Sequence, residues 1–397
     1  MPSDLSHLSG NPKLIQAIIE EISFKGPLTF ARFMELALYH EGHGYYMTQA
    51  IEHDQSSQER IGWGGDFYTA PELSPILAKT LVRQVVEIDA QLGHPTPFVF
   101  VEMGCGNGTF AGDFLQYCEE IAPDLLARLN YFLVERSLYL QSVQESYIRE
   151  VMGSRGESQL RWVSSVEQLE GDSVTGVMFS NELVDAFPVH RVRFNTDHFQ
   201  EELVDFEDGQ FMKRLGPLSS PSLEKYMSQH GVGFHEGQTS ELHLAAGQWM
   251  FHVARVLRHG IVITVDYGHT GSDYYASERN NGTFLCYYRH TVSMNPFERV
   301  GEQDMTTHVN FSALAKAGEE GGLNSIGFTT LANWLMGLGV EEMVGDQDPE
   351  SKEIQALSQL LRPHGMGTTF KVLIQRKGLE PKSLQGLRYR AFFDDVL

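Results

Sequence analysis

The stretch that decides the fold reads VFVEMGCGNGTFAGD, at residues 99–113. An apolar run ends at Glu102, glycines stand at alternate positions as Gly104, Gly106 and Gly108, and an amphipathic pattern follows. Glycine is used where backbone turns sharply or approaches a ligand closely, and the start of a helix aims N–H groups at an anion. The stretch therefore predicts either a binding loop for a nucleotide-like cofactor or a structural strand-to-helix turn.

The composition is that of an ordinary globular protein. The chain has 397 residues, 42% of them hydrophobic and 21% charged, which excludes disordered and fibrous classes. Cys105, Cys118 and Cys286 are too few and too scattered for a disulfide framework or a CxxC metal site. We therefore expect no bound metal and a reducing compartment.

Two further expectations concern location. No apolar run approaches the roughly 20 residues that a membrane helix needs, so we expect no membrane span. The start, MPSDLSHLSGNPK, has neither a secretory apolar core nor an Arg-rich transit pattern. From these patterns we expect a cytoplasmic protein.

The formal net charge of −22 bears on possible partners. Phosphate backbones repel that much negative charge, and no run of Lys and Arg offsets it, so we expect no nucleic-acid partner. The same charge would attract a cationic substrate, but surplus carboxylates also simply keep a surface soluble. Charge alone does not decide between these two explanations.

Apolar runs and helical patterns alternate from residue 98 onward. The pattern predicts strands at 98–103, 131–135, 161–163, 176–180 and 260–268, and helices at 109–121 and 137–150. Strands that alternate with helices favour a parallel sheet with helices on both faces. The predicted fold class is therefore α/β.

The remaining patterns fill in the organisation of the chain. Asn11-Pro12 and Ser74-Pro75 are each typical of a helix start. After residue 188 the pattern indicates an antiparallel meander with a turn at Asp208-Gly209, followed by a helix over 240–258. We expect an N-terminal helical region at 1–95, a catalytic core at 96–189 and 260–378, an inserted meander with its helix at 190–259, and a tail at 379–397.

The glycine loop favours one kind of cofactor. A dinucleotide fingerprint wants GxGxxG, and Thr109 occupies its third glycine position, which disfavours a nicotinamide dehydrogenase. Glu135 ends the next predicted strand, where an acid can bind ribose hydroxyls. S-adenosylmethionine has such a ribose, a carboxylate that suits the loop and an ammonium that Glu102 can engage. The alternative is a structural turn with two solvated carboxylates.

A second cluster lies in FSNELVDAFPVHR, at residues 179–191. Asn181, Glu182 and Asp185 follow an apolar strand, where α/β enzymes place reacting groups. A carboxylate there can hold a guanidinium through two hydrogen bonds, whereas a plain helix cap would use the same residue types. Asp266 stands at the analogous end of a later strand, with a loop cap as its alternative.

Longer strings in the chain carry a resemblance to a known family. They are LTFARFMELALYHEGHGYY, GGDFYTAPELSP, VEMGCGNGTFAGDFL, FLVERS, SNELVDAFPVHR, VDYG, GTFLCYYRH and GEQDMTTHVNFSAL. In this order they resemble the MidA-like family of class I S-adenosylmethionine-dependent methyltransferases, which includes a mitochondrial complex I assembly factor that methylates protein arginine. The match runs from about residue 27 to the strand near residue 370.

The resemblance implies a fold, a cofactor and a reaction. The fold is a mostly parallel seven-stranded sheet with helices on both faces, an N-terminal helical extension and an inserted antiparallel β/helical region. The cofactor is S-adenosylmethionine, and the reaction is methyl transfer to the arginine of a protein substrate. A small-molecule methyltransferase and a non-catalytic assembly chaperone that binds the cofactor remain as alternatives. The identity of the acceptor and the oligomeric state stay open.

The resemblance also assigns roles by position. The glycine loop and Glu135 would bind the cofactor, and Asn181 and Glu182 would face its methyl group. Three further pocket candidates are Asp66, placed with the cofactor, and Asp266 and His308, placed with the catalytic groups. A lone histidine such as His308 is also a common structural hydrogen-bonding group.

Overall fold

A computed structural model describes residues 7–49, 60, 66, 69–153, 159–231, 233–344, 351–362, 365–380 and 382–389. The chain divides into two compact units, each built from three stretches. The first unit comprises residues 1–67, 184–247 and 269–313, and the second comprises 68–183, 248–268 and 314–397. The four regions predicted from the sequence follow motifs, whereas these two units follow compactness. The two divisions describe different properties of the chain, so the predicted regions stay a prediction.

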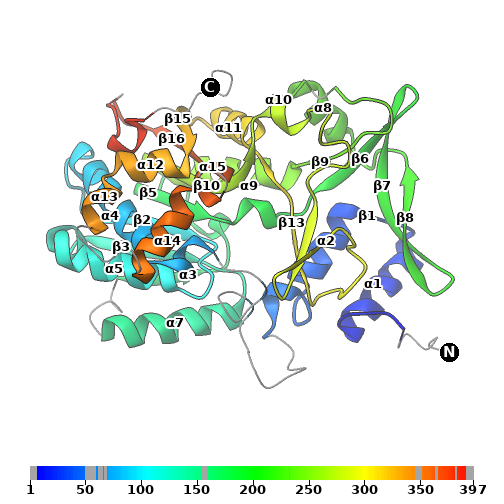
Figure 1. The fold of residues 1–397 in the computed structure, drawn as a ribbon, viewed down its shortest axis with the longest axis horizontal. Coiled ribbons are helices and arrows are strands. Elements are labelled where there is room, and N and C mark those ends of the chain that lie inside the picture. The colour runs from blue at the N-terminus through cyan, green and yellow to red at the C-terminus, as the bar shows by residue number, and fades with distance from the viewer. Residues whose placement is uncertain are drawn as a thin grey trace. The chain divides into compact units, whose positions relative to one another are not determined.

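One large sheet forms the centre of the second unit (Figure 1). The strands on its main path are β2 (Phe98–Met103), β3 (Leu129–Val134), β4 (Leu160–Val163), β5 (Val174–Asn181), β10 (Leu257–His269), β15 (Asn324–Thr330) and β16 (Phe370–Lys377). They lie in the order β15-β16-β10-β5-β2-β3-β4. The pairs among β10, β5, β2, β3 and β4 are parallel, and β16 is antiparallel to both neighbours. The predicted α/β class is confirmed.

Helices of the second unit bury the sheet. They are α3 (Ala70–Leu73), α4 (Ile76–Gln91), α5 (Thr109–Ile121), α6 (Pro123–Leu126), α7 (Leu138–Met152), α12 (Leu331–Gly337), α13 (Val340–Val344), α14 (Lys352–Leu361) and α15 (Met366–Thr369). All six residues of β2 are buried, as expected for a strand covered on both faces. The predicted helices over 109–121 and 137–150 are confirmed as α5 and α7.

Aromatic rings fill the core beneath the glycine loop. The Phe100 ring of β2 lies 4.6 Å from the ring of Phe114 on α5 and 4.9 Å from that of Tyr131 on β3, measured between centroids. Helix α4 adds Leu81 and Val85 to the same core, both fully buried. Its start is the one that the sequence indicates, because the Ser74 hydroxyl accepts a hydrogen bond from the Ile76 N–H at 3.3 Å. The loop therefore rests on a rigid, well-packed base.

The first unit combines N-terminal helices with antiparallel strands. Its helices include α1 (Pro12–Lys25), α2 (Phe30–Tyr39), α8 (Pro221–Gln229) and α10 (Gly271–Tyr274). One sheet has the order β1-β7-β6-β9, with β8 on β7, from β1 (Leu28–Thr29), β6 (His190–Asn195), β7 (His198–Glu207), β8 (Gln210–Gly216) and β9 (Thr239–Leu242). A second sheet joins β11 (Leu285–Tyr288), β12 (Thr291–Ser293) and β13 (Asp304–Thr306).

A helix cap and a hairpin turn in the first unit agree with the predictions from the sequence. The Asn11 side chain caps α1 by accepting hydrogen bonds from the N–H groups of Lys13 and Leu14, at 3.1 and 3.3 Å. Asp208 and Gly209 both have positive φ, at 51° and 83°, and connect β7 to β8 as a tight hairpin turn. The predicted meander is therefore confirmed.

The helix predicted over 240–258 is wrong at both ends. Residues 239–242 form β9, which pairs antiparallel with β6. The helix α9 covers Leu244–Val256, and β10 begins at Leu257. All four residues of β9 are buried, so the strand shows no polar and apolar alternation, and its backbone partner lies about 50 residues earlier in the chain. Among the described residues, no helix has the length and hydropathy to cross a bilayer.

The core of the second unit makes a prediction about stability. Leu81→Ala removes a side chain that is fully buried on α4, so we expect the free energy of unfolding to fall by about 2 to 5 kcal/mol. Val86→Ala is the matched control, because Val86 lies on the same helix with 37% of its surface exposed. We expect the control to cost less than about 1 kcal/mol in denaturant unfolding. Equal losses would contradict this assignment of the buried face.

Candidate functional site

The glycine loop between β2 and α5 requires its glycines. Gly104, Gly106 and Gly108 all have positive φ, at 76°, 53° and 91°. A Cβ on Gly104 would lie 2.9 Å from Cδ1 of Leu183, and one on Gly108 would lie 3.0 Å from the Cα of Gln144. Backbone conformation and space therefore both exclude a side chain at Gly104 and Gly108. The loop leads directly into the positive end of α5, where an anionic group is stabilised.

Glu135 follows β3 and lies beside this loop. Its Oε1 accepts a hydrogen bond from the Ser137 N–H at 2.8 Å, and its Oε2 accepts one from the Gln144 side chain at 3.2 Å. Burial raises the pKa of this carboxyl to about 7, against the hydrogen bonds that lower it. Each carboxylate oxygen can accept a second hydrogen bond, so the group suits a pair of ribose hydroxyls.

Gln144 is a site residue that the sequence reasoning missed. It is fully buried on α7, and its Nε2 donates to the Gly106 carbonyl at 2.8 Å as well as to Glu135. Its Oε1 accepts a hydrogen bond from the indole of Trp162 on β4 at 3.0 Å. The signal for it was spacing, because Gln144, Ile148 and Met152 are the buried positions of α7 and recur every four residues. A polar residue on such a stripe indicates a buried hydrogen-bonding role.

Glu102 ends the apolar run of β2 and is buried, with 4% of its surface exposed. The Tyr131 hydroxyl donates to its Oε2 at 2.5 Å. Burial raises the pKa of Glu102 to about 8, the Tyr131 hydrogen bond opposes this rise, and Glu135 adds to it. A cation placed beside Glu102 would compensate for its burial, which fits the predicted role toward an ammonium group.

The end of β5 carries Asn181 and Glu182. Glu182 has a positive φ of 51°, and its N–H donates to the Val265 carbonyl at 3.0 Å. Its Oε1 accepts hydrogen bonds from the Asn181 amide at 3.1 Å and from the N–H of Ala70, the first residue of α3, at 3.2 Å. The carboxylate therefore does cap a helix, but that helix is α3 and not a helix that begins after β5.

Asp266 lies at the same end of the neighbouring strand. Asn181 on β5 is paired with Val265 on β10, so Asp266 follows one position later. It is fully buried, and its Oδ1 accepts a hydrogen bond from the Tyr267 N–H at 2.9 Å. Since β10, β5, β2 and β3 are successive parallel neighbours, one edge of the sheet brings together the predicted second-unit residues: Glu102, the three glycines, Glu135, Asn181, Glu182 and Asp266.

Asp66 belongs to the first unit, where tyrosines surround two carboxylates. Its Oδ2 accepts a hydrogen bond from the Tyr45 hydroxyl at 2.7 Å, and its Oδ1 accepts one from the Arg289 N–H at 2.8 Å. The Tyr46 hydroxyl donates to Asp304 at 2.8 Å. Burial raises the pKa of Asp304 to about 7, with further contributions from Asp185 and Asp66. The predicted role of Asp66 toward the cofactor stays a prediction.

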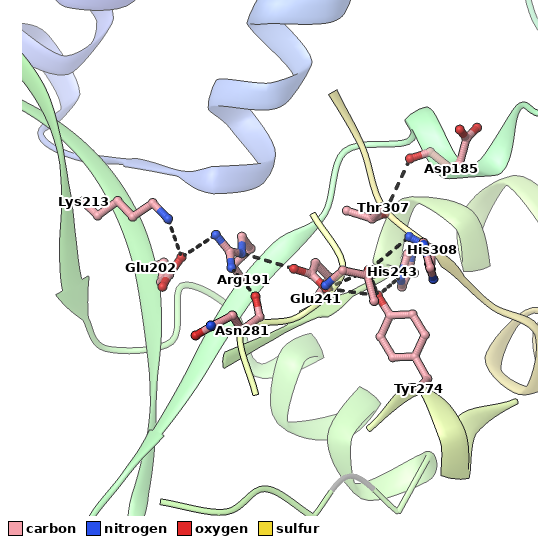
Figure 2. A network of polar contacts seen from close by, with 11 residues as sticks. Asp185, Arg191, Glu202, Lys213, Glu241, His243, Tyr274, Asn281, Thr307 and His308 are labelled. Carbon is pink, nitrogen blue, oxygen red and sulfur yellow. Dashed lines mark hydrogen bonds and ion pairs between the residues drawn. The ribbon is translucent and has the colours of Figure 1, made fainter. Parts of the chain in front are cut away.

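Asp185 and His308 also belong to the first unit, and Figure 2 shows both side chains within a network of polar contacts. The Asp185 carbonyl accepts a hydrogen bond from the Thr307 N–H at 2.9 Å, which joins the two segments. His308 donates its own N–H to the Thr283 hydroxyl at 3.0 Å, and its Nδ1 lies 2.9 Å from Nε2 of His269. His308 is therefore held firmly, which fits either of the roles considered for it. Among the described residues, no group of three or more His, Cys, Asp and Glu side chains is arranged to hold a metal ion.

Comparison with known proteins identifies the family. A family model described as "Putative S-adenosyl-L-methionine-dependent methyltransferase" matches residues 80–329, more than half of the chain, including the glycine loop, Glu135 and Glu182. The chain belongs to this family. The predicted resemblance is confirmed, and so is the class of enzyme, a methyltransferase that depends on S-adenosylmethionine.

The alignments with curated relatives span nearly the whole length of this chain. The mitochondrial protein arginine methyltransferase NDUFAF7 homologue of Drosophila melanogaster is 25% identical over 402 residues, which span 94% of this chain and 86% of the relative. Human NDUFAF7, named a mitochondrial protein arginine methyltransferase, is 25% identical over 95% of this chain and 86% of its own length.

Solved structures agree with these relatives. A Burkholderia thailandensis protein crystallised with S-adenosyl-homocysteine superposes with a TM-score of 0.85 at 29% identity, covering 95% of both chains. A native structure of a protein from the same organism gives a TM-score of 0.81, also at 29% identity. S-adenosyl-homocysteine is the cofactor without its methyl group, so the predicted choice of S-adenosylmethionine is confirmed.

The predicted cytoplasmic location is wrong. The curated relatives are named mitochondrial, which contradicts it. A low cysteine count indicates a reducing environment but does not say which compartment provides it. The amino-acid composition of a protein reflects the conditions under which it folds and does not identify the compartment to which the cell targets it.

The crowded glycine loop predicts a loss of cofactor affinity in one variant and not in its control. In Gly108→Ala the new Cβ meets the backbone of Gln144, so we expect the affinity for S-adenosylmethionine in calorimetry to fall about tenfold or more, or ~1.4 kcal/mol. Gly153→Ala is the control, because Gly153 also has positive φ, at 60°, but among the residues that the structure describes its Cβ would meet nothing within 4 Å. Equal affinities would show that this contact does not shape the site.

The raised pKa of Glu102 predicts how stability depends on pH. Below pH 4.5, which is the ordinary pKa of this carboxyl, Glu102 is protonated in both the folded and the unfolded protein. Between pH 4.5 and about 8 the unfolded chain releases this proton, whereas the folded protein keeps it. The stabilisation is therefore lost as the pH rises toward 8. In urea unfolding without cofactor, we expect the free energy of unfolding of the wild type to fall by roughly 1 kcal/mol or more between pH 5 and 8, relative to that of Glu102→Gln.

A matched control for that measurement is Glu120→Gln, because Glu120 lies exposed on α5. Its difference from wild type should stay constant over the same pH interval. Parallel pH profiles for wild type and Glu102→Gln would refute the assignment of a buried, proton-holding Glu102.

Proposed function

We propose that this enzyme methylates arginine side chains of a protein substrate and that Glu182 holds the guanidinium. The observation that carries the proposal is the carboxylate of Glu182 at the end of β5, the strand next to the glycine loop, on a residue with positive φ. The names of the curated relatives, which are protein arginine methyltransferases, support the choice of acceptor. The net charge of −22 also suits a cationic acceptor.

The residues at the sheet edge fit the cofactor. The glycine loop and the start of α5 would hold its carboxylate, Glu135 its ribose hydroxyls and Glu102 its ammonium. The fit rests on positions where a Cβ would not be tolerated and on two buried carboxyls whose raised pKa values reflect burial. When bound, the cofactor supplies a methyl group on a sulfonium, which is a good leaving group.

Glu182 has the chemistry and the rigidity to position a guanidinium. A guanidinium offers N–H donors in a flat fork, and a carboxylate accepts two of them at once. The hydrogen bonds from Asn181 and Ala70 to Oε1, together with the one from the Glu182 N–H to Val265, fix the direction of the carboxylate. Methyl transfer depends on alignment of one nitrogen with the methyl group, so a fixed carboxylate contributes directly.

The other predicted groups take supporting roles in the proposal. Asn181 orients Glu182, and Asp266 adds negative charge one position further along the next strand. In the first unit, Asp66, Asp185 and His308 remain proposed pocket residues. Their contacts with Tyr45, Thr307 and His269 make them well ordered, which a recognition site requires.

Glu182→Gln separates this role from a structural cap. The substitution keeps the size of the side chain and removes its charge. We expect near-normal thermal stability and cofactor affinity, with single-turnover methyl transfer slower by roughly 10²-fold or more. The acceptor for this assay is a protein extract from cells that lack the enzyme, and mass spectrometry reads the methyl-arginine formed.

The control for that comparison is Glu170→Gln, an exposed glutamate in the same unit, which should transfer methyl groups like wild type. If Glu182 only caps α3, its substitution should cost roughly 0.3 to 1 kcal/mol of stability and leave the rate nearly unchanged. That outcome would remove Glu182 from the mechanism.

A further inference from the structure

Trp162 lies on β4, the strand that also holds the backbone of Glu135. The carbonyl of Val163, the next residue of β4, accepts a hydrogen bond from the Glu135 N–H at 2.9 Å. Trp162 packs against the core of the second unit, and its indole N–H donates to Oε1 of Gln144 at 3.0 Å. One strand therefore holds Glu135 through the backbone and reaches Gln144 through a side chain.

The indole of Trp162 determines which way the Gln144 amide faces. An indole N–H only donates hydrogen bonds, so the amide atom beside it must be the oxygen. The amide nitrogen then faces two acceptors, the Gly106 carbonyl at 2.8 Å and Oε2 of Glu135 at 3.2 Å. A reversed amide would set two donors against each other at Trp162, and two acceptors against each other at Gly106 and at Glu135.

Packing leaves the Gln144 side chain little freedom apart from this choice. Gln144 is fully buried, and a Cβ on Gly108 would lie 3.3 Å from both its Cβ and its Cγ. The terminal torsion of a glutamine is broad and roughly two-fold, so packing alone selects weakly between the two directions of the amide. The hydrogen bond from Trp162 makes that selection.

We propose that Trp162 is a positioning residue for the cofactor, which orients the Gln144 amide so that Glu135 and the glycine loop are held ready for the ribose hydroxyls of S-adenosylmethionine. The inference rests on the proposed role of Glu135 and extends it to a residue that acts through Gln144. A donor fixed beside Oε2 limits the rotation of the Glu135 carboxylate, and hence the direction in which its remaining lone pairs face.

Indole NMR tests the contact in the protein alone. The chain has four tryptophans, and the indole signal of Trp162 is the one that Trp162→Phe removes. Gln144→Met keeps the length of the side chain and removes the acceptor. We expect it to move the Trp162 N–H signal upfield and to speed its exchange with water by roughly tenfold or more. An unchanged signal and exchange rate would overturn the proposal.

Calorimetry with S-adenosylhomocysteine tests the effect on the ribose. We expect the wild type to bind it about tenfold or more tightly than its 2′,3′-dideoxyribose analogue, which lacks both hydroxyls. Trp162→Phe keeps an aromatic ring and removes the donor. We expect this variant to lower that ratio by roughly threefold or more, with most of the change in the affinity for S-adenosylhomocysteine. A ratio equal to that of the wild type would contradict the positioning role.

Trp334→Phe is the matched control for that measurement. Trp334 is fully buried in the same unit, and its indole nitrogen has no hydrogen-bond partner among the residues that the structure describes. The control removes the same ring system without removing a hydrogen bond to Gln144. Its ratio of affinities should equal that of the wild type, and a fall as large as in Trp162→Phe would indicate a general effect of lost packing.

A double substitution tests whether Trp162 acts through Gln144. If it does, adding Trp162→Phe to Gln144→Met should change the affinity for S-adenosylhomocysteine by less than about twofold, although Trp162→Phe alone lowers it more. Losses that multiply in the double variant would show that the two residues act independently and would overturn the proposal.

These measurements separate the inference from the proposals on which it rests. Equal affinity of the wild type for S-adenosylhomocysteine and for the dideoxy analogue would refute the role of Glu135 toward the ribose, and the positioning role with it. Discrimination that Trp162→Phe retains in full would refute the positioning role alone. The absence of methyl-arginine would concern the acceptor only, since none of these measurements involves methyl transfer.

Discussion

The hydrogen bond from the Gln144 amide to the Gly106 carbonyl, at 2.8 Å, is the contact on which the cofactor site depends. It ties the glycine loop to α7, and the same amide group also holds Glu135. The packing is tight, because the Cα of Gln144 would lie only 3.0 Å from a Cβ on Gly108. The loop can therefore keep its left-handed glycines only while α7 stays packed on the sheet. Its position follows from the buried stripe of that helix.

The carboxyl end of the sheet buries acidic side chains, and other contacts of the second unit must offset this unfavourable burial. Glu102 and Glu135 are buried there, and burial raises their pKa values above and toward neutrality, respectively. Burying such groups without a partner of opposite charge is unfavourable. The aromatic core beneath them, with rings of Phe100, Phe114 and Tyr131 in contact, stabilises the arrangement. Groups that break the usual rules of burial are expected at a functional site.

The sequence predicted what local patterns encode and missed what distant contacts decide. The strand at 98–103 and the helix at 109–121 follow from apolar runs and the glycine loop, and both have the predicted bounds. The strand β9 was missed because its partner β6, far away in the sequence, defines it. The spacing along α7 indicates that Gln144 is buried, but only the fold shows that its side chain binds the Gly106 carbonyl. The contact between His269 and His308 was missed for the same reason, because the two residues lie 39 positions apart in the chain.

The backbone of Glu182 supports the role that we propose for its carboxylate. The edge of the second unit offers hydrogen-bond acceptors, and Glu182 among them has a positive φ, which costs of order 1 kcal/mol or more in a residue with a side chain. A cap for α3 requires no such strain, because Ser, Thr, Asp or Asn at the helix start provides one in ordinary extended backbone. The guanidinium of an arginine only donates hydrogen bonds, so it complements a carboxylate that is held in this strained position for a purpose other than capping.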